Sequence, residues 1–374
     1  MSRIYCRQTD RYYIDIIAGS GVTRAVENSL ALGIGKVSRE VSVTRALKGV
    51  SLASIPYFQK SEYIDFHMTS IVVLPDIMAL YSKYPELDRE NEMRVVSLIE
   101  NTKLEGSHDL VAEHGLSLYI ESNGKKILFD TGASEAFDQN AFKLGIKLEE
   151  VDALVISHHH YDHGGGLARF LEVNQTSKVY LRKSEEEDFY FRIPGIVSRY
   201  VGLDQELLEK RADRFEFVDS FTEILPNMYI LTGIPQSYAL PKGNQRLFIK
   251  KGKTFSQDRF QHELIMVHRD ADELVVFTGC AHNGILNMVG AVTGQFPGEA
   301  IKGVFGGFHL IGLPKLNTMA GSKRSVRGIA VELMKFPIER IYTGHCTGRK
   351  AYQVLKGVMA EKLDYFPTGS EVLL

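Results

Sequence analysis

Four potential metal ligands stand within six residues of one run, His158-x-His160-x-Asp162-His163, and this run restricts the fold and the chemistry of the chain most. It follows the apolar stretch Val151–Ile156, which is typical of a buried strand. Because residues i and i+2 of an extended segment point to the same side, His158 and His160 can bind one ion. Asp162 and His163 lie beyond the point where the chain turns and can reach a second ion. Imidazole nitrogens and carboxylate oxygens suit Zn²⁺ and also Mn or Fe, so the run predicts a metal site.

Three glycines, Gly164 to Gly166, come directly after the run. They allow the backbone to turn tightly beneath the metals, and Leu167–Leu171 can then begin a helix. The alternative is a histidine cluster without function, such as an affinity tag. A tag would stand at a chain end without the aspartate, so a metal site is the better interpretation.

Further motifs accompany the run in a fixed order along the chain: Ala112–Leu118, Ile127–Gly132, Phe277–Ile285, Gly306–Leu310 and Tyr342–Gly348. Together they resemble the metallo-β-lactamase superfamily, and within it a group of dihydropterin or methanopterin-pathway synthase-like metallo-hydrolases. The resemblance covers about residues 93–374. It implies the metallo-β-lactamase fold, which is an α/β four-layer αββα sandwich, here with an extra N-terminal α/β module.

Residues 1–92 do not match the family pattern, and we expect them to form a module of unknown role in front of a catalytic domain of residues 93–374. The polar segment Tyr84–Glu92, which contains Pro85, is the expected boundary.

Within the module, Tyr12–Ile17 is predicted to be a strand, and the turn Gly19–Gly21 to open a helix over Val22–Leu32. A glycine turn at a helix N-terminus can hold phosphate. This one lacks a P-loop lysine and a full dinucleotide fingerprint, so a plain strand-turn-helix unit is preferred.

Strand-like and helical runs alternate through the rest of the chain, as a layered α/β fold requires. The hydrophobic patterns predict strands at Arg94–Glu100, Leu116–Glu121, Lys126–Phe129, Ala153–Ile156, Lys178–Leu181, Leu274–Thr278, Ile301–Phe305 and Ile338–Tyr342. They predict helices at Phe137–Leu144, Gly166–Glu172, Leu203–Phe215, Gly284–Val292, Ser322–Met334 and Ala351–Met359. Asn123-Gly124 predicts a tight hairpin turn.

The resemblance also implies how the ligands are shared between two metals. Matched by motif, His158 and His160 hold the first metal, and Asp162 and His163 the second. His345 matches the last ligand of the superfamily and is expected at the second metal.

Two departures from the family pattern affect this ligand set. Superfamily members usually carry a metal-binding histidine in one turn. In this chain Tyr229–Pro235 occupies the place of that turn and contains no histidine, so His282 is the expected third ligand of the first metal. Cys280 stands where a bridging aspartate is usual. Its thiolate can bind the second metal or bridge both, and a small buried thiol is the equal alternative.

Other residues are expected around the metals rather than on them. Asp130 follows a strand and can accept the second N–H of a metal-binding histidine, with loop capping as the alternative. His309 and His114 are candidates for a substrate ligand or a catalytic proton donor, and Asp162 can also orient the attacking hydroxide. His159 is expected to pack or meet solvent, and Tyr161 to line the pocket.

Composition excludes several classes of protein. With 44% hydrophobic and 24% charged residues and a net charge of −2, the chain gives no reason to expect nucleic acid or a membrane as a partner. Its 3 cysteines argue against a disulfide framework. The polar N-terminus is unlike a signal peptide, and Pro75 interrupts the apolar run Ile71–Leu74. We therefore expect a cytoplasmic protein with a small-molecule substrate.

The predicted function is that of a metallo-hydrolase with two divalent ions, with zinc expected first and manganese or iron as alternatives. A metal-bound hydroxide would attack a small ester, lactone or phosphoester. A pterin-linked substrate is implied by the resemblance alone. Two alternatives stay open: a pterin-pathway transferase, like a dihydropteroate synthase, on the same metals, and a non-catalytic metal-bound effector. A flavodiiron oxidoreductase and a nuclease are disfavoured, because the chain lacks a following flavodoxin-like domain and a basic arm.

Overall fold

The computed structural model describes residues 2–6, 12–16, 92–184, 188–271, 273–312 and 318–374. The chain divides into two units, Met1–Glu92 and Met93–Leu374, and each is described by itself. In the first unit, β1 (Ser2–Cys6) pairs with β2 (Tyr12–Ile16) in an antiparallel hairpin, which confirms the strand predicted at Tyr12. The predicted glycine turn and the helix after it lie outside the described residues.

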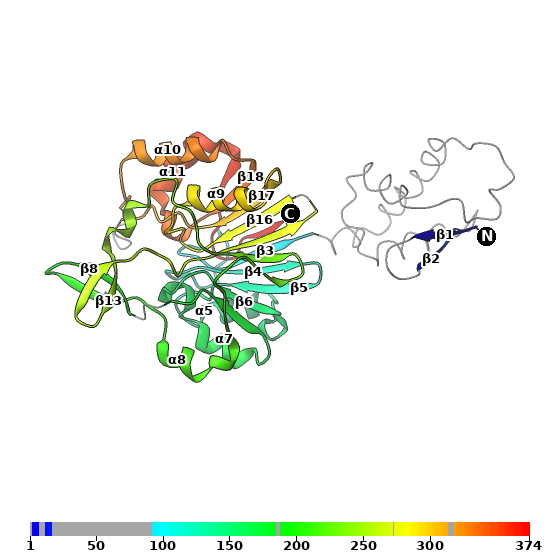
Figure 1. Cartoon of the computed structure of the whole chain (residues 1–374), viewed down its shortest axis with the longest axis horizontal. Coiled ribbons are helices and arrows are strands. Elements are labelled where there is room, and N and C mark those ends of the chain that lie inside the picture. The colour runs from blue at the N-terminus through cyan, green and yellow to red at the C-terminus, as the bar shows by residue number, and fades with distance from the viewer. Residues whose placement is uncertain (1, 7–11, 17–91, 185–187, 272, 313–317) are drawn as a thin grey trace. The chain divides into compact units, whose positions relative to one another are not determined.

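The second unit contains two seven-stranded sheets that lie face to face between helices (Figure 1). The first sheet has the order β10 (Phe215–Phe217), β7 (Lys178–Leu181), β6 (Ala153–Ile156), β5 (Lys125–Phe129), β4 (Ser117–Ser122), β3 (Arg94–Ile99) and β20 (Glu371–Leu373). The second has the order β11 (Thr222–Leu225), β12 (Met228–Leu231), β15 (Ile265–Asp270), β16 (Glu273–Thr278), β17 (Ala300–Gly306), β18 (Ile338–Thr343) and β19 (Leu363–Tyr365).

Helices cover the outer face of each sheet and complete four layers. Along the chain they are α5 (Ala136–Lys143), α6 (Tyr161–Gly164), α7 (Leu167–Val173), α8 (Gln205–Lys210), α9 (Ile285–Gln295), α10 (Lys323–Leu333) and α11 (Arg349–Met359). Figure 1 shows α5 and α7 against the first sheet and α9 to α11 against the second. The predicted αββα sandwich is confirmed.

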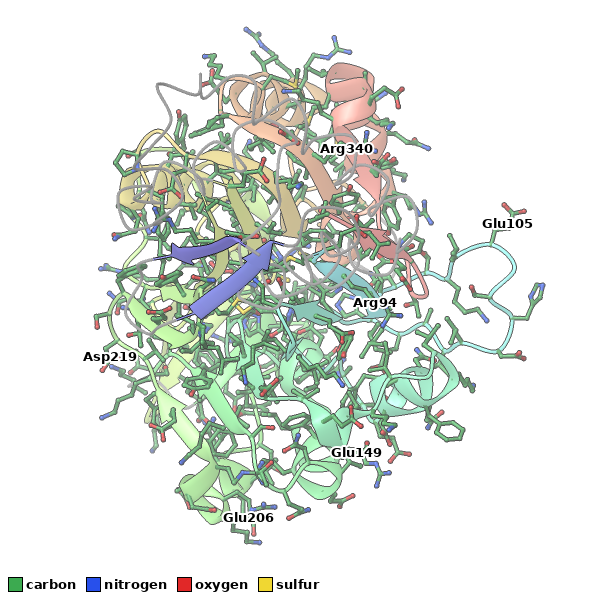
Figure 2. The ribbon with its side chains drawn as sticks, turned by 90° about the vertical axis from the view of Figure 1, so that its right-hand side faces the viewer. Arg94, Glu105, Glu149, Glu206, Asp219 and Arg340 are labelled. Carbon is green, nitrogen blue, oxygen red and sulfur yellow. The ribbon has the colours of Figure 1, made fainter. Side chains whose placement is uncertain are left out.

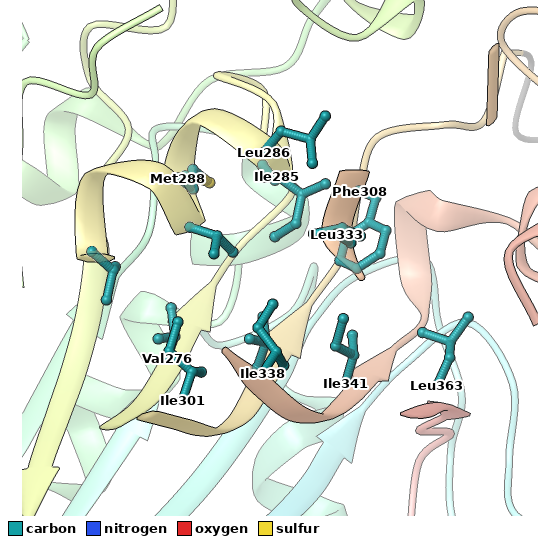
Figure 3. Packing of buried hydrophobic residues seen from close by; sticks show 14 of the residues in the cluster. Val276, Ile285, Leu286, Met288, Ile301, Phe308, Leu333, Ile338, Ile341 and Leu363 are labelled. Carbon is teal, nitrogen blue, oxygen red and sulfur yellow. The ribbon is translucent and has the colours of Figure 1, made fainter. Parts of the chain in front are cut away.

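Three apolar layers hold the sandwich together. Between the sheets, the rings of Phe129, Phe277 and Phe305 pack in one cluster. Another cluster joins the first sheet to α5 and α7. Figure 3 shows the third, in which Ile285 and Met288 of α9 pack above Val276 and its neighbours in the second sheet. Charged side chains such as Glu149, Glu206 and Arg340 lie on the outside (Figure 2).

The unit is closed by its own ends. Met93 and Leu374 exchange two backbone hydrogen bonds, at 3.1 and 2.9 Å, and β20 extends the first sheet beside β3. No helix among the described residues is long and apolar enough to cross a membrane.

The helix predicted at Leu203–Phe215 is wrong in extent. Asp204 accepts a hydrogen bond from the Leu207 backbone N–H and begins α8, which ends at Lys210 without a single buried residue. Phe215 instead enters the edge strand β10, because its ring packs in the cluster beneath the first sheet.

A smaller four-stranded sheet was not predicted at all. Its order is β14 (Thr254–Gln257), β13 (Leu247–Lys251), β8 (Asp188–Ile193) and β9 (Val197–Tyr200). It projects to the left in Figure 1. Only four of its residues or neighbours, Phe189, Val201, Leu247 and Phe260, form a buried cluster, so its apolar pattern in the sequence is weak.

Candidate metal centre

The predicted site residues follow the carboxyl ends of strands from both sheets. Strands β5, β6 and β7 run parallel in one sheet, as do β16, β17 and β18 in the other. Because parallel strands end at the same edge of a sheet, the segments that follow them meet. The histidine run follows β6, and the segments after β5, β16, β17 and β18 carry Asp130, His282, His309 and His345.

His158, His160 and His282 form the first ligand group. One nitrogen of each ring lies within 4.8 Å of the other two, and all three residues are buried. The Nε2 atoms of all three rings are buried without a hydrogen-bond partner. Buried polar atoms are almost always paired, so three such nitrogens directed at one point indicate a place for a cation.

Hydrogen bonds at the opposite ring nitrogens leave Nε2 free to bind metal. The Ser157 hydroxyl lies 2.9 Å from Nδ1 of His158. Nδ1 of His282 donates to the Asn244 amide oxygen at 3.0 Å, and Asn244 also donates to the His282 carbonyl. Such bonds fix the tautomer that leaves a lone pair on Nε2.

The second ligand group surrounds Asp162. Its Oδ2 lies 3.4 Å from Nε2 of His345 and 3.3 Å from Nε2 of His114. His163 lies nearby, with Nε2 3.1 Å from Sγ of Cys280. The structure therefore brings together the residues predicted for the second metal, and it adds His114, which was expected only beside the metals.

The histidines of the second group are also held at Nδ1. Nδ1 of His163 donates to Oδ2 of Asp130 at 2.6 Å, and Asp130 also accepts from the backbone and hydroxyl of Ser157. Nδ1 of His345 donates to the Asn101 amide oxygen at 2.8 Å, so its unpaired Nε2 points to Asp162. Asp130 thus contacts a histidine of the run, and Asn101 has the same role for His345.

Burial keeps most of these imidazoles neutral, which is the form that binds metal. Burial lowers the pKa of His160 to about 4 and that of His345 to about 3. It also places the pKa of His158 and His282 well below the ordinary value. For His163, burial acts in the same direction but the Asp130 carboxylate outweighs it and raises the pKa.

The two acidic groups of the site differ in charge. Burial, the largest influence on Asp162, opposes ionisation, but the neighbouring imidazoles of His114 and His345 bring its pKa well below the ordinary value. Burial and the neighbouring Cys346 thiol raise the pKa of Cys280. Cys280 therefore keeps its proton unless a bound cation compensates the charge of the thiolate.

His309 lies against the first group. Its ring centroid is 4.1 Å from that of His282, its Nδ1 is buried without a partner, and its backbone N–H donates to Sγ of Cys346 at 3.3 Å. Burial lowers the pKa of His309 to about 3, so the ring is a neutral neighbour of the centre.

Left-handed backbone angles gather around the centre. The φ angles are 61° at Asp130, 53° at Ala281, 46° at His309 and 48° at His345. Residues other than glycine rarely adopt this conformation, and the rest of the structure must hold them there. At these residues the backbone turns sharply after each strand, which directs the side chains that follow the strands toward the centre.

Two residues of the run do not join either group. His159 is 3% exposed and donates through Nε2 to the Arg182 carbonyl at 2.7 Å, so it packs rather than meeting solvent. Tyr161 lines a pocket of about 530 Å³ together with Tyr200 and Leu203.

Several contributors were not predicted: Glu100, Asn101, Asn244, Asp258, His262, Glu263 and Cys346. The only signal in the sequence was the position of Cys346 next to His345. The donor set of the centre, with neutral imidazoles, an ionised carboxylate and a thiol, fits divalent metal ions such as zinc.

Comparisons with known proteins agree with this fold. The sequence profile of the Metallo-beta-lactamase superfamily matches residues 110–235. A crystal structure described as a metal-dependent hydrolase of the beta-lactamase superfamily is 32% identical, with a TM-score of 0.62, over 75% of this chain and 98% of its own. An uncharacterized protein of Methanocaldococcus jannaschii is 32% identical over 258 residues, which are 68% of this chain and 90% of that protein.

A layered sandwich with a histidine-rich centre at its strand ends defines a class of metal-dependent proteins, and the chain belongs to the metallo-β-lactamase superfamily. A relative from Methanocaldococcus jannaschii is named 7,8-dihydropterin-6-methyl-4-(beta-D-ribofuranosyl)-aminobenzene-5'-phosphate synthase. It is 27% identical over 279 residues, which are 69% of this chain and 89% of the relative.

Proposed function

We propose that this protein is a hydrolase that uses two divalent ions, zinc first among them, to cleave a small ester, lactone or phosphoester. One observation supports it most: the buried, unpaired Nε2 atoms of His158, His160 and His282 lie close together, and that of His345 lies beside Asp162. Two ions bound there would lower the pKa of a bound water toward neutrality and polarise the bond under attack.

The residues of the chain have separate tasks in this proposal. Asp162 is ionised and belongs to the second ligand group, where it can accept a proton from the attacking water and fix its direction. His114 is the partly exposed member, with 37% of its side chain accessible, and its Nε2 reaches Asp162. It can therefore meet the leaving group and return the proton.

Among the three bond types, the surroundings favour a phosphoester. A pocket of about 500 Å³ lies next to the first ligand group, since its walls include Asp258 and Phe260, and the Phe260 ring stacks on His282 at 4.2 Å. Arg182 and Arg259 line the same pocket. Within the described part of the chain neither guanidinium has an ion-pair partner, and burial lowers the pKa of Arg182. A half-buried guanidinium that forms no ion pair with the described residues, and is influenced by Asp219 only from a distance, favours an anionic substrate.

A pterin-pathway transferase is the second candidate, because the relative that is 27% identical is named a synthase. Its name also supports a pterin-linked substrate with a phosphate group. The same metals would then activate a nucleophile other than water.

The test is a substrate panel of phosphodiesters, phosphomonoesters, esters and lactones, with metal content measured by elemental analysis. The zinc-loaded protein should hydrolyse at least one phosphoester. His160→Ala and Asp162→Ala should lose both metal and turnover, whereas His108→Ala, an exposed histidine, should lose neither. Full metal content in both site variants would contradict the ligand assignment.

The arginine pocket has its own test. The double variant Arg182→Met, Arg259→Met should raise KM for a phosphodiester by at least about tenfold, because even one charged hydrogen bond contributes about 1.5–3 kcal/mol. KM for a neutral lactone and the metal content should not change. Arg340→Met, which removes a surface arginine paired with Asp364, is the matched control.

A further inference from the structure

One loop contacts all three histidines of the first ligand group, and its hydrogen bonds to them have no part in the proposed function. The loop Asp258–Glu263 lies between β14 and β15. Asp258, Phe260, His262 and Glu263 are each buried, with 0–5% exposure, although two of them carry a charge and one is a histidine. Buried polar groups of this kind are kept only where each has a partner.

On one side, the loop holds the backbone between two ligands of the run. Nδ1 of His262 accepts the backbone N–H of His159 at 3.1 Å, and His159 separates His158 from His160. The His262 ring lies 6.1 Å from that of His158 and 5.7 Å from that of His160, measured between centroids. A shift of His262 would therefore change the angle between the two metal-binding rings.

The tautomer of His262 follows from this contact. A backbone N–H can only donate, so Nδ1 must accept and the ring proton must lie on Nε2. From there it donates to Oδ2 of Asp258 at 3.1 Å. Oδ1 of Asp258 accepts the backbone N–H of Phe260 at 2.6 Å, so both carboxylate oxygens are engaged.

On the other side, the loop holds His282. The Phe260 ring stacks on the His282 ring, with centroids 4.2 Å apart and planes 3° from parallel. Glu263 accepts the backbone N–H of His282 at 2.8 Å and that of Asn283 at 2.7 Å. The turn that carries the third ligand is thus tied to the same short loop.

We propose that the loop Asp258–Glu263 positions the ligands of the first metal, and that the Asp258–His262 pair is its central element. Asp258 and His262 bind no metal themselves: His262 uses both nitrogens elsewhere, on His159 and Asp258. They act by fixing His158 and His160 at one separation. The inference rests on the metal binding of the proposed function but does not depend on which bond is cleaved.

The experiment titrates metal-free full-length protein with zinc against a chelator of known affinity, and records the absorption spectrum of the cobalt-substituted protein. His262→Leu should weaken zinc at one of the two sites about 10–100-fold, which is the usual effect of losing a partner that orients a ligand. The second zinc should bind as before, and the cobalt spectrum should change for one ion only.

Two further variants separate positioning from stability. His262→Asn can place its amide oxygen where Nδ1 was and still accept the His159 N–H, so it should recover most of the affinity. Asp258→Asn keeps the shape of the side chain but has one acceptor oxygen, whereas His262 and the Phe260 backbone each donate to a separate oxygen of Asp258. The zinc affinity of the first site should therefore fall about tenfold. If His262→Leu does not fold, the zinc affinities of His262→Asn and Asp258→Asn test the proposal.

His268→Leu is the control, since His268 is also buried and has one side-chain partner, Ser122 at 3.2 Å. It should lower the melting temperature without changing either zinc affinity. Unchanged affinity at both sites in Asp258→Asn, or equal losses at both sites in the His262 and His268 variants, would overturn the proposal. Because the readout is metal binding, a protein with normal zinc titrations but no turnover would contradict the proposed function alone.

Discussion

At the scale of single residues, His282 and His309 pose a choice. Their rings lie 4.1 Å apart at the first ligand group, and each has a buried nitrogen without a partner. His282 forms a ligand group with His158 and His160, whereas His309 is grouped with Cys280 and His282. We therefore expect His282→Ala to bind one zinc per chain and His309→Ala to bind two, as measured by elemental analysis after dialysis. The opposite result would make His309 the third ligand.

The buried histidines also predict how stability depends on pH. In the metal-free protein the pKa of His160 is lowered to about 4 and that of His345 to about 3, mainly by burial, from 6.5. As the pH falls below about 6.5, these histidines become protonated in the unfolded chain but stay neutral in the folded chain. The free energy of unfolding therefore falls toward pH 4. Each such histidine contributes a slope of up to about 1.4 kcal/mol per pH unit. Urea unfolding of chelator-treated protein at pH 7, 6 and 5 measures it, and equal stability at all three would show that burial does not suppress their protonation.

The residues of the ligand run were predictable because local geometry alone brings together four metal-ligating side chains that stand within six residues. Asn101 and Asn244 were not, although each fixes the tautomer of a histidine. Asn101 lies in a loop and Asn244 in a short 3-10 helix. They are 244 and 38 residues from their partners in the sequence, and nothing local marks either of them. His262 gave no signal because His159, which it holds, lies 103 residues away in the sequence, although its other partner, Asp258, is only 4 residues away.

At the scale of elements, the interface between the two sheets depends on aromatic rings. Phe277 of β16 is fully buried and lies 6.1 Å from Phe129 of the first sheet and 5.3 Å from Phe305 of the second. Phe277→Ala should lower the free energy of unfolding by about 3–5 kcal/mol, because it leaves a cavity where the sheets meet. Phe142→Ala, at a position 84% exposed, should change it by less than about 0.5 kcal/mol. Denaturant titrations of both variants give the comparison.

Elements with a buried face were predictable, and elements without one were not. The strand at Ala153–Ile156 was predicted with its observed bounds, since every residue in it is buried. Helix α8 buries none of its residues, so its periodic pattern carried no information about where it ends. All four residues of β9 are exposed, and the small sheet to which it belongs escaped prediction for that reason.

At the scale of the whole molecule, residues 93–374 should fold and bind metal without the residues before them. Both ligand groups and all three apolar layers lie within this range. A chain that starts at Met93 should keep its metal content and its circular dichroism spectrum. Loss of both would show that the first 92 residues complete the core. As a contrast, deletion of residues 370–374 should be harmful, since it removes β20 and exposes the edge of β3.

Because Met93 and Leu374 are hydrogen-bonded to each other, the first and last residues of the second unit lie side by side at the edge of the sheet. A short linker from Leu374 to Met93 would make the second unit a cyclic chain. New ends could then be opened at Gly195-Ile196, a hairpin tip with Ile196 77% exposed, far along the chain from every ligand discussed above. The order of the elements along the chain is thus separable from the metal centre they build, and a circular permutant cut at this tip should still assemble both ligand groups.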